Sequence, residues 1–231
     1  MSTVAENYRS VCARLDDAAL RHHRESGAVK LLAVSKTKPA ESVRTCYDLG
    51  QRAFGENYLQ DALDKIHALQ DLPDIEWHFI GPLQSNKTRA VAEHFQWLET
   101  LEREKIARRL NEQRPDHLPP LNVLIQVNIS GEAQKSGLDV NDVMSFAQTL
   151  ASLPRLKVRG LMCIPEATDD AERLSAQFTQ MHQLWQRLQQ QYPQADTLSM
   201  GMSSDLELAI ACGSTEVRIG TDIFGARNTP A

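Results

Sequence analysis

The stretch LLAVSKTKP, residues 31–39, decides the fold and suggests the chemistry of this chain. Four apolar residues lead directly into a serine and a lysine, and Pro39 suits the first turn of a helix. The stretch therefore predicts a buried strand followed by a helix. Because side chains alternate along a strand, Leu32, Val34 and Lys36 share one face. If that face lines the interior of a barrel, Lys36 stands at the mouth.

Lys36 is a candidate Schiff-base lysine in this arrangement. An amine held in a barrel mouth loses hydration, which favours its neutral form, and a neutral amine attacks aldehydes. The alternative is an ordinary solvated lysine after a strand. This stretch by itself favours the solvated lysine, since lysine is mostly exposed in proteins. The rest of the chain has to decide between the two.

Composition indicates a globular protein without a nucleic-acid surface. The chain has 231 residues, of which 42% are hydrophobic and 24% charged, and a net charge of −5 with no basic block. We expect no signal peptide and no membrane span, and hence a cytoplasmic protein. The cysteines are far apart in sequence, which predicts reduced thiols and neither disulfides nor a zinc site. They are Cys12, Cys46, Cys163 and Cys212.

Helical and strand patterns alternate along the chain. Apolar spacings of three and four predict a first helix over about 4–23, with Ser2 or Thr3 as its cap and Glu6 at the capping-box spacing from Thr3. Eight strand patterns follow, each separated from the next by a helical segment. They cover residues 31–36, 51–55, 76–80, 96–100, 121–128, 157–162, 196–200 and 216–219.

This alternation predicts a parallel sheet with right-handed crossovers. Eight units in a chain of nearly the usual length predict a closed (β/α)8 TIM barrel. The alternative is an open doubly wound sheet, which would carry a glycine fingerprint after the first strand. Residues 35–39 contain no glycine, so we expect the barrel. We predict a single domain over 1–231, with an extra N-terminal helix at about 4–23 and the barrel at about 30–227.

The loops after strands seven and eight suggest a phosphate site. In such barrels these two loops often bind phosphate. Here they offer Ser203 in one loop, and Gly220 with Thr221 in the other. Glycine lets the backbone approach a ligand closely, and the hydroxyls can donate hydrogen bonds. The alternative for the first loop is that Ser203 or Ser204 simply caps the next helix.

Two further side chains belong to the same mouth. Arg218 lies near the end of the eighth strand, where a buried guanidinium is costly unless it is paired. Its alternative role is an ion pair with an interior carboxylate such as Glu216 on the same face. Asn57 follows the second strand and is otherwise a turn residue. A lysine, a phosphate cup and an arginine match pyridoxal 5′-phosphate (PLP), which has an aldehyde, a phosphate and a ring nitrogen.

The sequence resembles the family of pyridoxal phosphate homeostasis proteins, the YggS-like proteins, over essentially the whole chain. The resemblance implies the barrel fold of alanine racemase and PLP as the cofactor. It implies Lys36 as the lysine that holds PLP as an aldimine, and Arg218 directed at the pyridine nitrogen. It also implies Ser203, Gly220 and Thr221 on the phosphate, with Asn57 near the ring. The matching stretches are LLAVSKTKP (31–39), FGENYLQ (54–60), EWHFIGPLQSNK (76–87), GLMCIP (160–165), LSMGMSSD (198–205) and VRIGTDIFGAR (217–227).

Three functions remain open at the level of sequence. A racemase needs acid/base groups on both faces of the substrate carbon. In alanine racemases a tyrosine from a separate β-domain is the second base, and this chain ends at Ala231, just after the eighth unit. A Schiff-base aldolase would need acid/base carboxylates beside the lysine, and no pair is evident. We therefore expect a carrier, buffer or regulator in PLP homeostasis, without appreciable turnover and without catalytic residues.

The expected partners are PLP and PLP-dependent apoenzymes as its recipients, with no nucleic acid and no membrane. We expect a monomer.

No Cys/His cluster has metal-ligand spacing, so no metal site is predicted. His78 is either a mouth residue or an interior histidine. Lys38 and Lys135 are solvated loop lysines or add positive charge near the mouth.

Overall fold

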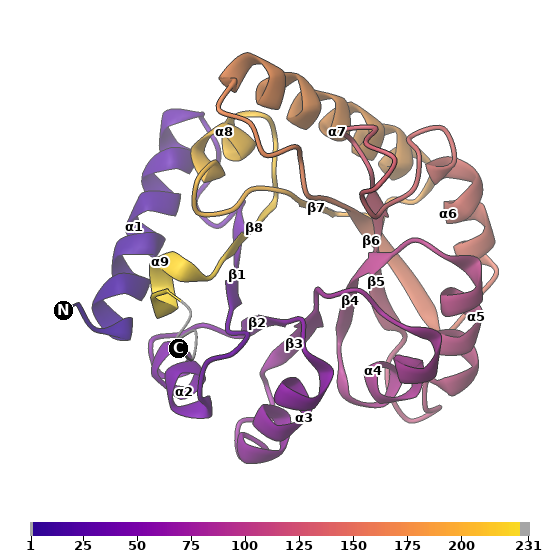
Figure 1. Ribbon diagram of the computed structural model, residues 1–231, viewed down its shortest axis with the longest axis horizontal. Helices are drawn as coiled ribbons and strands as arrows, with labels where there is room; N and C mark the ends of the chain where they lie inside the picture. The colour runs from indigo at the N-terminus through magenta and orange to yellow at the C-terminus, as the bar shows by residue number, and fades with distance from the viewer. Residues whose placement is uncertain (1, 227–231) are drawn as a thin grey trace.

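Eight parallel strands close into a barrel in the order in which they occur in the chain. The computed structural model describes residues 2–226, and Figure 1 views the ring of strands with its helices outside. The (β/α)8 prediction is confirmed, whereas residue 227, the predicted end of the barrel, lies outside the described residues, and the extent of the domain stays a prediction. The strands are β1 (Lys30–Val34), β2 (Ala53–Glu56), β3 (Glu76–Phe79), β4 (Trp97–Leu101), β5 (Leu121–Val127), β6 (Leu156–Cys163), β7 (Thr197–Ser199) and β8 (Glu216–Ile219).

Helices cover the outside of the barrel. They are α1 (Val4–Arg21), α2 (Ala40–Asp48), α3 (Leu59–Ala68), α4 (Thr88–His94) after the 3-10 turn η1 (Ser85–Lys87), α5 (Glu104–Gln113), α6 (Val143–Ala151), α7 (Ala171–Gln191), α8 (Leu206–Ala211) and α9 (Thr221–Phe224). The predicted capping box is present, since Thr3 and Glu6 exchange hydrogen bonds. Helix α1 packs against α8 and α9 (Figure 1). The extra N-terminal helix therefore lies beside the loops that follow β7 and β8.

Two details of the last helices differ from the sequence prediction. Helix α8 has Asp205 at its N-cap, and no side chain caps it, so the prediction that Ser203 or Ser204 is the cap was wrong. Helix α9 begins at Thr221, which the sequence analysis placed in the loop after the eighth strand. Helix α8 was expected up to Ala211, whereas α9, with four residues, is too short to be recognised from apolar periodicity, which needs about 11 residues. Ser203 and Ser204 instead remain in the loop at the barrel mouth.

Apolar side chains fill the space between strands and helices, and a smaller set lies inside the barrel. The outer core includes the completely buried Phe54, Leu98 and Phe178. The inner cluster consists of Trp97, Leu124 and Met162. Burial of apolar area supplies the main stabilisation at roughly 25 cal/mol per Å².

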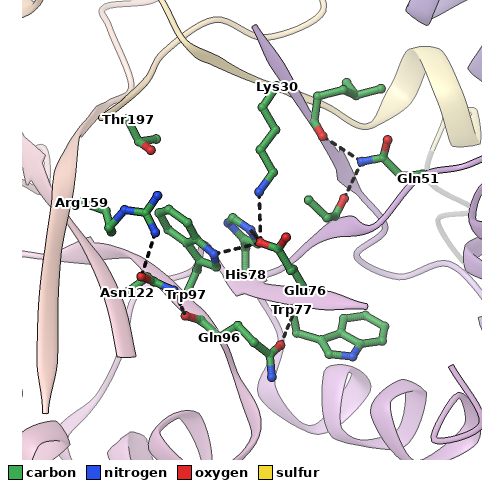
Figure 2. Close-up of polar contacts among 12 residues, drawn as sticks. Lys30, Gln51, Glu76, Trp77, His78, Gln96, Trp97, Asn122, Arg159 and Thr197 are labelled. Atoms are coloured by element: carbon green, nitrogen blue, oxygen red, sulfur yellow. Dashed lines mark hydrogen bonds and ion pairs between the residues drawn. The ribbon is translucent and has the colours of Figure 1, made fainter. Parts of the chain in front are cut away.

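A polar layer fills the N-terminal end of the barrel (Figure 2). Glu76 accepts hydrogen bonds from Lys30 Nζ and from Trp97 Nε1, both at 3.1 Å. The guanidinium of Arg159 lies 4.7 Å from the centre of a Trp97 ring, and His78 stacks on Trp97 with 4.9 Å between ring centres. Lys30 and Glu76 thus pair with each other, and the charges of Lys30 and Arg159 also lie against Trp97.

Strand β6 carries a bulge that the sequence pattern did not reveal. Val123 pairs with Val158 and Leu124 with Gly160, so Arg159 is an extra residue on β6. Gly160 has φ +144°, and a Cβ added there would lie 1.7 Å from the carbonyl oxygen of Thr197 on β7. Only glycine allows this approach of the two backbones.

None of the helices within residues 2–226 is long and apolar enough to cross a membrane.

The four cysteines are free, as the sequence predicted. Cys46 and Cys163 are completely buried, and burial raises the pKa of each thiol to about 12. At neutral pH these two thiols are therefore protonated and behave as packing groups.

The bulge predicts that Gly160→Ala destabilises the protein far more than an alanine at another glycine of positive φ. Gly50 is the matched control, since it has φ +104° and no atom within 4 Å of an added Cβ. We expect a loss of about 3 kcal/mol or more for Gly160→Ala, against about 1 kcal/mol for Gly50→Ala. Urea denaturation measures both. Equal losses would show that β6 and β7 can separate at no cost.

Candidate functional site

A cavity of about 480 Å³ lies at the C-terminal ends of the strands, where the sequence placed the site. Lys36 and Asn57 reach it from just beyond β1 and β2, and Arg218 reaches it from β8. Apolar side chains from β1, β6 and the loops, among them Val34 and Met162, complete the wall. All six predicted site residues line this one cavity: Lys36, Asn57, Ser203, Arg218, Gly220 and Thr221.

A buried ionic clamp fixes the residue before Lys36. The Ser35 hydroxyl donates to Glu56 Oε1 at 2.6 Å, and Lys65 Nζ donates to Ser35 O and to Glu56 Oε1, both at 2.7 Å. Burial raises the pKa of Glu56, and the neighbouring Lys65 opposes that shift. Breaking such a buried pair by removing one partner costs about 3–5 kcal/mol. The clamp therefore ties the end of β1 firmly to β2 and α3.

The residue after Lys36 is held in an unusual backbone conformation. Thr37 has φ +63°, a left-handed value that is rare for a β-branched residue. Its N–H donates to Asp61 Oδ2 at 3.1 Å, and Asp61 in turn pairs with Lys65 at 2.9 Å. Strain of this kind persists only where the surroundings enforce it. Lys36 thus stands between two fixed neighbours, which limits the directions in which its side chain can extend.

Arg14 of α1 braces the two loops that follow β7 and β8. Its guanidinium donates to Ser203 O at 2.8 Å, to Glu207 and to Asp222 Oδ2 at 2.9 Å. Ser203 lies in the loop after β7 and Asp222 in α9, which follows β8, so one side chain connects the segments that follow the last two strands. The sequence gave no sign of this role, because Arg14 lies almost 200 residues before its partners.

Arg218 is only 6% exposed, and its guanidinium points into the barrel. Within residues 2–226 it donates to Ser199 Oγ at 2.7 Å and to the carbonyl oxygen of Cys163 at 2.9 Å. The suggested ion pair with Glu216 is therefore not how the structure satisfies this group. Two neutral acceptors hold it instead, one on the adjacent strand β7 and one on β6, the strand beyond it.

His78, Glu99 and Glu216 form a buried cluster in the barrel interior. Their ligand atoms lie within 4.8 Å of one another, which is a spacing that a metal ion can use. His78 Nδ1 is only 2.7 Å from Glu99 Oε1, however, which is a hydrogen-bond distance. Two ligands that are each about 2.1 Å from one tetrahedral metal ion lie more than ~3 Å apart. The observed geometry is that of groups that share protons.

Glu216 is the member of this cluster without a hydrogen-bond partner at either side-chain oxygen. It is 1% exposed. Burial, reinforced by the neighbouring Glu99 carboxylate, raises the pKa of Glu216 to about 8. At neutral pH Glu216 is thus mainly an uncharged carboxylic acid.

The secondary candidates take different places. His78 is completely buried in the barrel interior, so it is the interior histidine and not one of the residues that line the cavity. Lys38 lines the cavity, and its Nζ donates to Ala226 O at 2.8 Å. Lys135 pairs with Glu132 at 2.8 Å and lines two neighbouring hollows.

The cavity has the donor set that PLP requires. It combines a lysine amine, a fixed guanidinium and two loops that carry hydroxyls and a glycine. In addition, the buried Oδ1 of Asn57 has no hydrogen-bond partner, which is rare unless a ligand supplies one. The residues present therefore fit this group.

Comparison with known proteins agrees with this geometry. Residues 12–228 match the family model described as alanine racemase, N-terminal domain. The chain is 54% identical over 230 residues to the pyridoxal phosphate homeostasis protein of Pasteurella multocida, covering 98% of both chains. The chain belongs to the pyridoxal phosphate homeostasis protein family. The sequence-based assignment to this family is confirmed.

Solved structures extend the comparison. PipY of Synechococcus elongatus, a structure with PLP bound, is 38% identical with a TM-score of 0.82, and the match covers 96% of this chain and 100% of that one. Alanine racemase of Corynebacterium glutamicum is 18% identical with a TM-score of 0.70, and the match covers 99% of this chain and 62% of that one. The second likeness concerns the fold alone. This member of the pyridoxal phosphate homeostasis protein family thus has the barrel of alanine racemase.

The raised pKa of Glu216 predicts a specific pH dependence of stability. Between its ordinary pKa of 4.5 and the folded value of about 8, the folded state holds a proton that the unfolded state has lost. Stability therefore falls as pH rises, by up to about 1.4 kcal/mol per pH unit from this group. Glu216→Gln removes that loss. The free energy of unfolding of the variant, relative to that of wild type, should therefore increase from pH 5 to pH 8. Urea denaturation at several pH values measures it.

The exposed Glu112 provides the control, since Glu112→Gln leaves the buried Glu216 in place and should keep the pH dependence that Glu216 gives to wild type. A Glu216→Gln advantage that does not change with pH would mean that Glu216 is ionised in the folded protein.

Proposed function

We propose that this protein binds PLP in the cavity at the barrel mouth and serves in intracellular PLP homeostasis as a carrier, buffer or regulator. The observation that carries the proposal is the convergence of the six predicted residues on one cavity. The names of the relatives and the PLP-bound structure of PipY support it. In the proposed role a monomer in the cytoplasm delivers PLP to PLP-dependent apoenzymes.

Lys36 is the residue that holds the aldehyde in this proposal. When bound, PLP supplies an aldehyde that reacts with amines and a ring that withdraws electrons. The clamp on Ser35 and the fixed backbone of Thr37 direct the Lys36 side chain into the cavity. A lysine that is oriented in advance loses less entropy when it binds its ligand.

Ser203, Gly220 and Thr221 are the proposed phosphate ligands. They come from two loops that Arg14 ties together, so the cup needs little rearrangement to accept an anion. Helices α8 and α9 are only six and four residues long, and their dipoles add little. Hydroxyl groups and backbone N–H groups of the loops then provide most of the attraction for the phosphate. They bind it through charge-assisted hydrogen bonds.

Arg218 and Asn57 orient the ring. A guanidinium is always protonated and offers only donors, so Arg218 directed at the pyridine nitrogen keeps that nitrogen free of a proton. Asn57 has its unpartnered Oδ1 available for a donor on the ligand. Orientation at two edges of the ring complements the attachments at Lys36 and at the phosphate cup.

We also infer that the site lacks appreciable turnover of amino acids. Racemisation requires acid/base groups on both faces of the substrate carbon. Among residues 2–226, those that line the cavity include no tyrosine, histidine, aspartate or glutamate. Besides Lys36 the lining offers Lys38, whose Nζ already donates to Ala226 O. A second base in a suitable position is therefore the element that the cavity does not provide.

The first test is covalent trapping of PLP. Borohydride reduction of wild-type protein loaded with PLP should leave one group attached to the peptide that contains Lys36. In Lys36→Ala that attachment should disappear, because the remaining contacts bind PLP only noncovalently. Lys38→Ala, a change two residues away in the same cavity, should retain it. Mass spectrometry reads out the result, and trapping of wild-type amounts by Lys36→Ala would contradict the assignment.

The second test distinguishes the carrier from a racemase. PLP-loaded protein is incubated with L-alanine and other L-amino acids in deuterium oxide. We expect the α-proton to be retained and no D-isomer to form, because proton transfer on the second face has no group to perform it. Proton NMR and chiral chromatography measure both. Rapid exchange with formation of the D-isomer, abolished in Lys36→Ala, would establish a racemase.

A further inference from the structure

Arg218 places a permanent positive charge in the interior of the barrel, and its direct partners do not balance it. Both acceptors, Ser199 Oγ and Cys163 O, are neutral. A buried charge without a counter-charge costs several kcal/mol, so an opposite charge should lie close by. Ser199 shows where it is, because its hydroxyl also contacts a carboxylate.

The hydrogen bonds that lead from Arg218 through Ser199 to Glu99 have a fixed direction. Arg218 can only donate, so the single proton of the Ser199 hydroxyl is directed to Glu99 Oε2 at 2.9 Å. The other oxygen of Glu99 lies 2.7 Å from His78 Nδ1, and a Glu99 that balances the charge of Arg218 accepts a hydrogen bond from that nitrogen. Burial lowers the pKa of His78, so this ring is neutral with its proton on Nδ1. Glu99 thereby accepts from both sides and is itself completely buried.

We propose that Glu99 is a positioning residue that acts through Ser199 to hold Arg218 in place at the cavity and to balance its buried charge. The inference rests on the proposed function, since it concerns the contact of Arg218 with PLP. It adds residues that do not line the cavity, and so would not be found from the cavity alone.

Glu216 is the competing counter-charge, and the structure argues against it. It lies two residues before Arg218 on the same inward-facing row of β8, yet neither of its oxygens has a hydrogen-bond partner. A carboxylate that balanced Arg218 would be expected to accept a hydrogen bond, directly or through a hydroxyl. Glu216 is thus the matched control, an equally buried glutamate in the same cluster without a hydrogen bond to the guanidinium or to Ser199.

The test compares the dissociation constant for PLP and the visible absorption maximum of the loaded whole chain in four proteins: wild type, Glu99→Gln, Ser199→Ala and Glu216→Gln. Loss of the Ser199 hydroxyl that Arg218 contacts, or of the Glu99 charge behind that hydroxyl, should weaken PLP binding about tenfold in Ser199→Ala and in Glu99→Gln. The absorption maximum should shift in both, because Arg218 no longer lies at the ring nitrogen in the same way. Glu216→Gln should match wild type within about twofold.

A double-mutant cycle separates positioning from general packing. In an Arg218→Gln background, Glu99→Gln should cause no further loss of affinity, because the residue through which it acts is gone. Urea denaturation confirms that each variant is folded, and Ser199→Ala carries the same prediction if Glu99→Gln does not fold. Wild-type affinity and spectrum in both single variants, or an equal loss in the Arg218→Gln background, would overturn the proposal.

Borohydride trapping, together with these measurements of PLP affinity, distinguishes failure of this inference from failure of the proposed function. If wild-type protein fails to retain PLP on Lys36 after borohydride reduction, the proposed function is contradicted, and the positioning role falls with it. If wild type retains PLP while Glu99→Gln and Ser199→Ala bind it equally well, only the positioning role is contradicted.

Discussion

Closure of eight parallel strands into one barrel is the constraint on which the rest of this structure depends. Closure brings the C-terminal ends of all strands to one mouth, and it gives every strand an inward-facing row of side chains. Lys36, Asn57 and Arg218 are distant in sequence, yet each continues or ends such a row. No single loop has to fold around the ligand, because the barrel itself sets the distances between these groups.

The same closure creates a problem of buried charge, which the structure solves with a small number of contacts. At the N-terminal end, Glu76 lies between Lys30 and Trp97. In the middle, Arg218 is connected to Glu99 through a single serine hydroxyl. Beside the mouth, Lys65 joins Glu56 and Ser35. In each case the charged group is also held in one orientation, so charge balance and rigidity of the site have the same origin.

The fold and six of the residues that line the cavity were predictable from the sequence, because both depend on local pattern. Alternation of strands and helices predicted the barrel, and inward parity of Leu32, Val34 and Lys36 placed the lysine at the mouth. The interior partners were not predictable in this way. Ser199 and Glu99 meet across 100 residues, and such a contact requires the register of the whole barrel. The bulge at Arg159, which shifts that register, has no periodic signal.

The central claim is that PLP lies in the cavity at the C-terminal end of the barrel and is attached to Lys36. A crystal structure of the protein saturated with PLP tests it most directly. The account predicts continuous electron density from Lys36 Nζ into the ligand, phosphate oxygens against Ser203 and Thr221, and the Arg218 guanidinium at the ring nitrogen. PLP bound at another surface, or in this cavity with the phosphate directed away from those two loops, would contradict it.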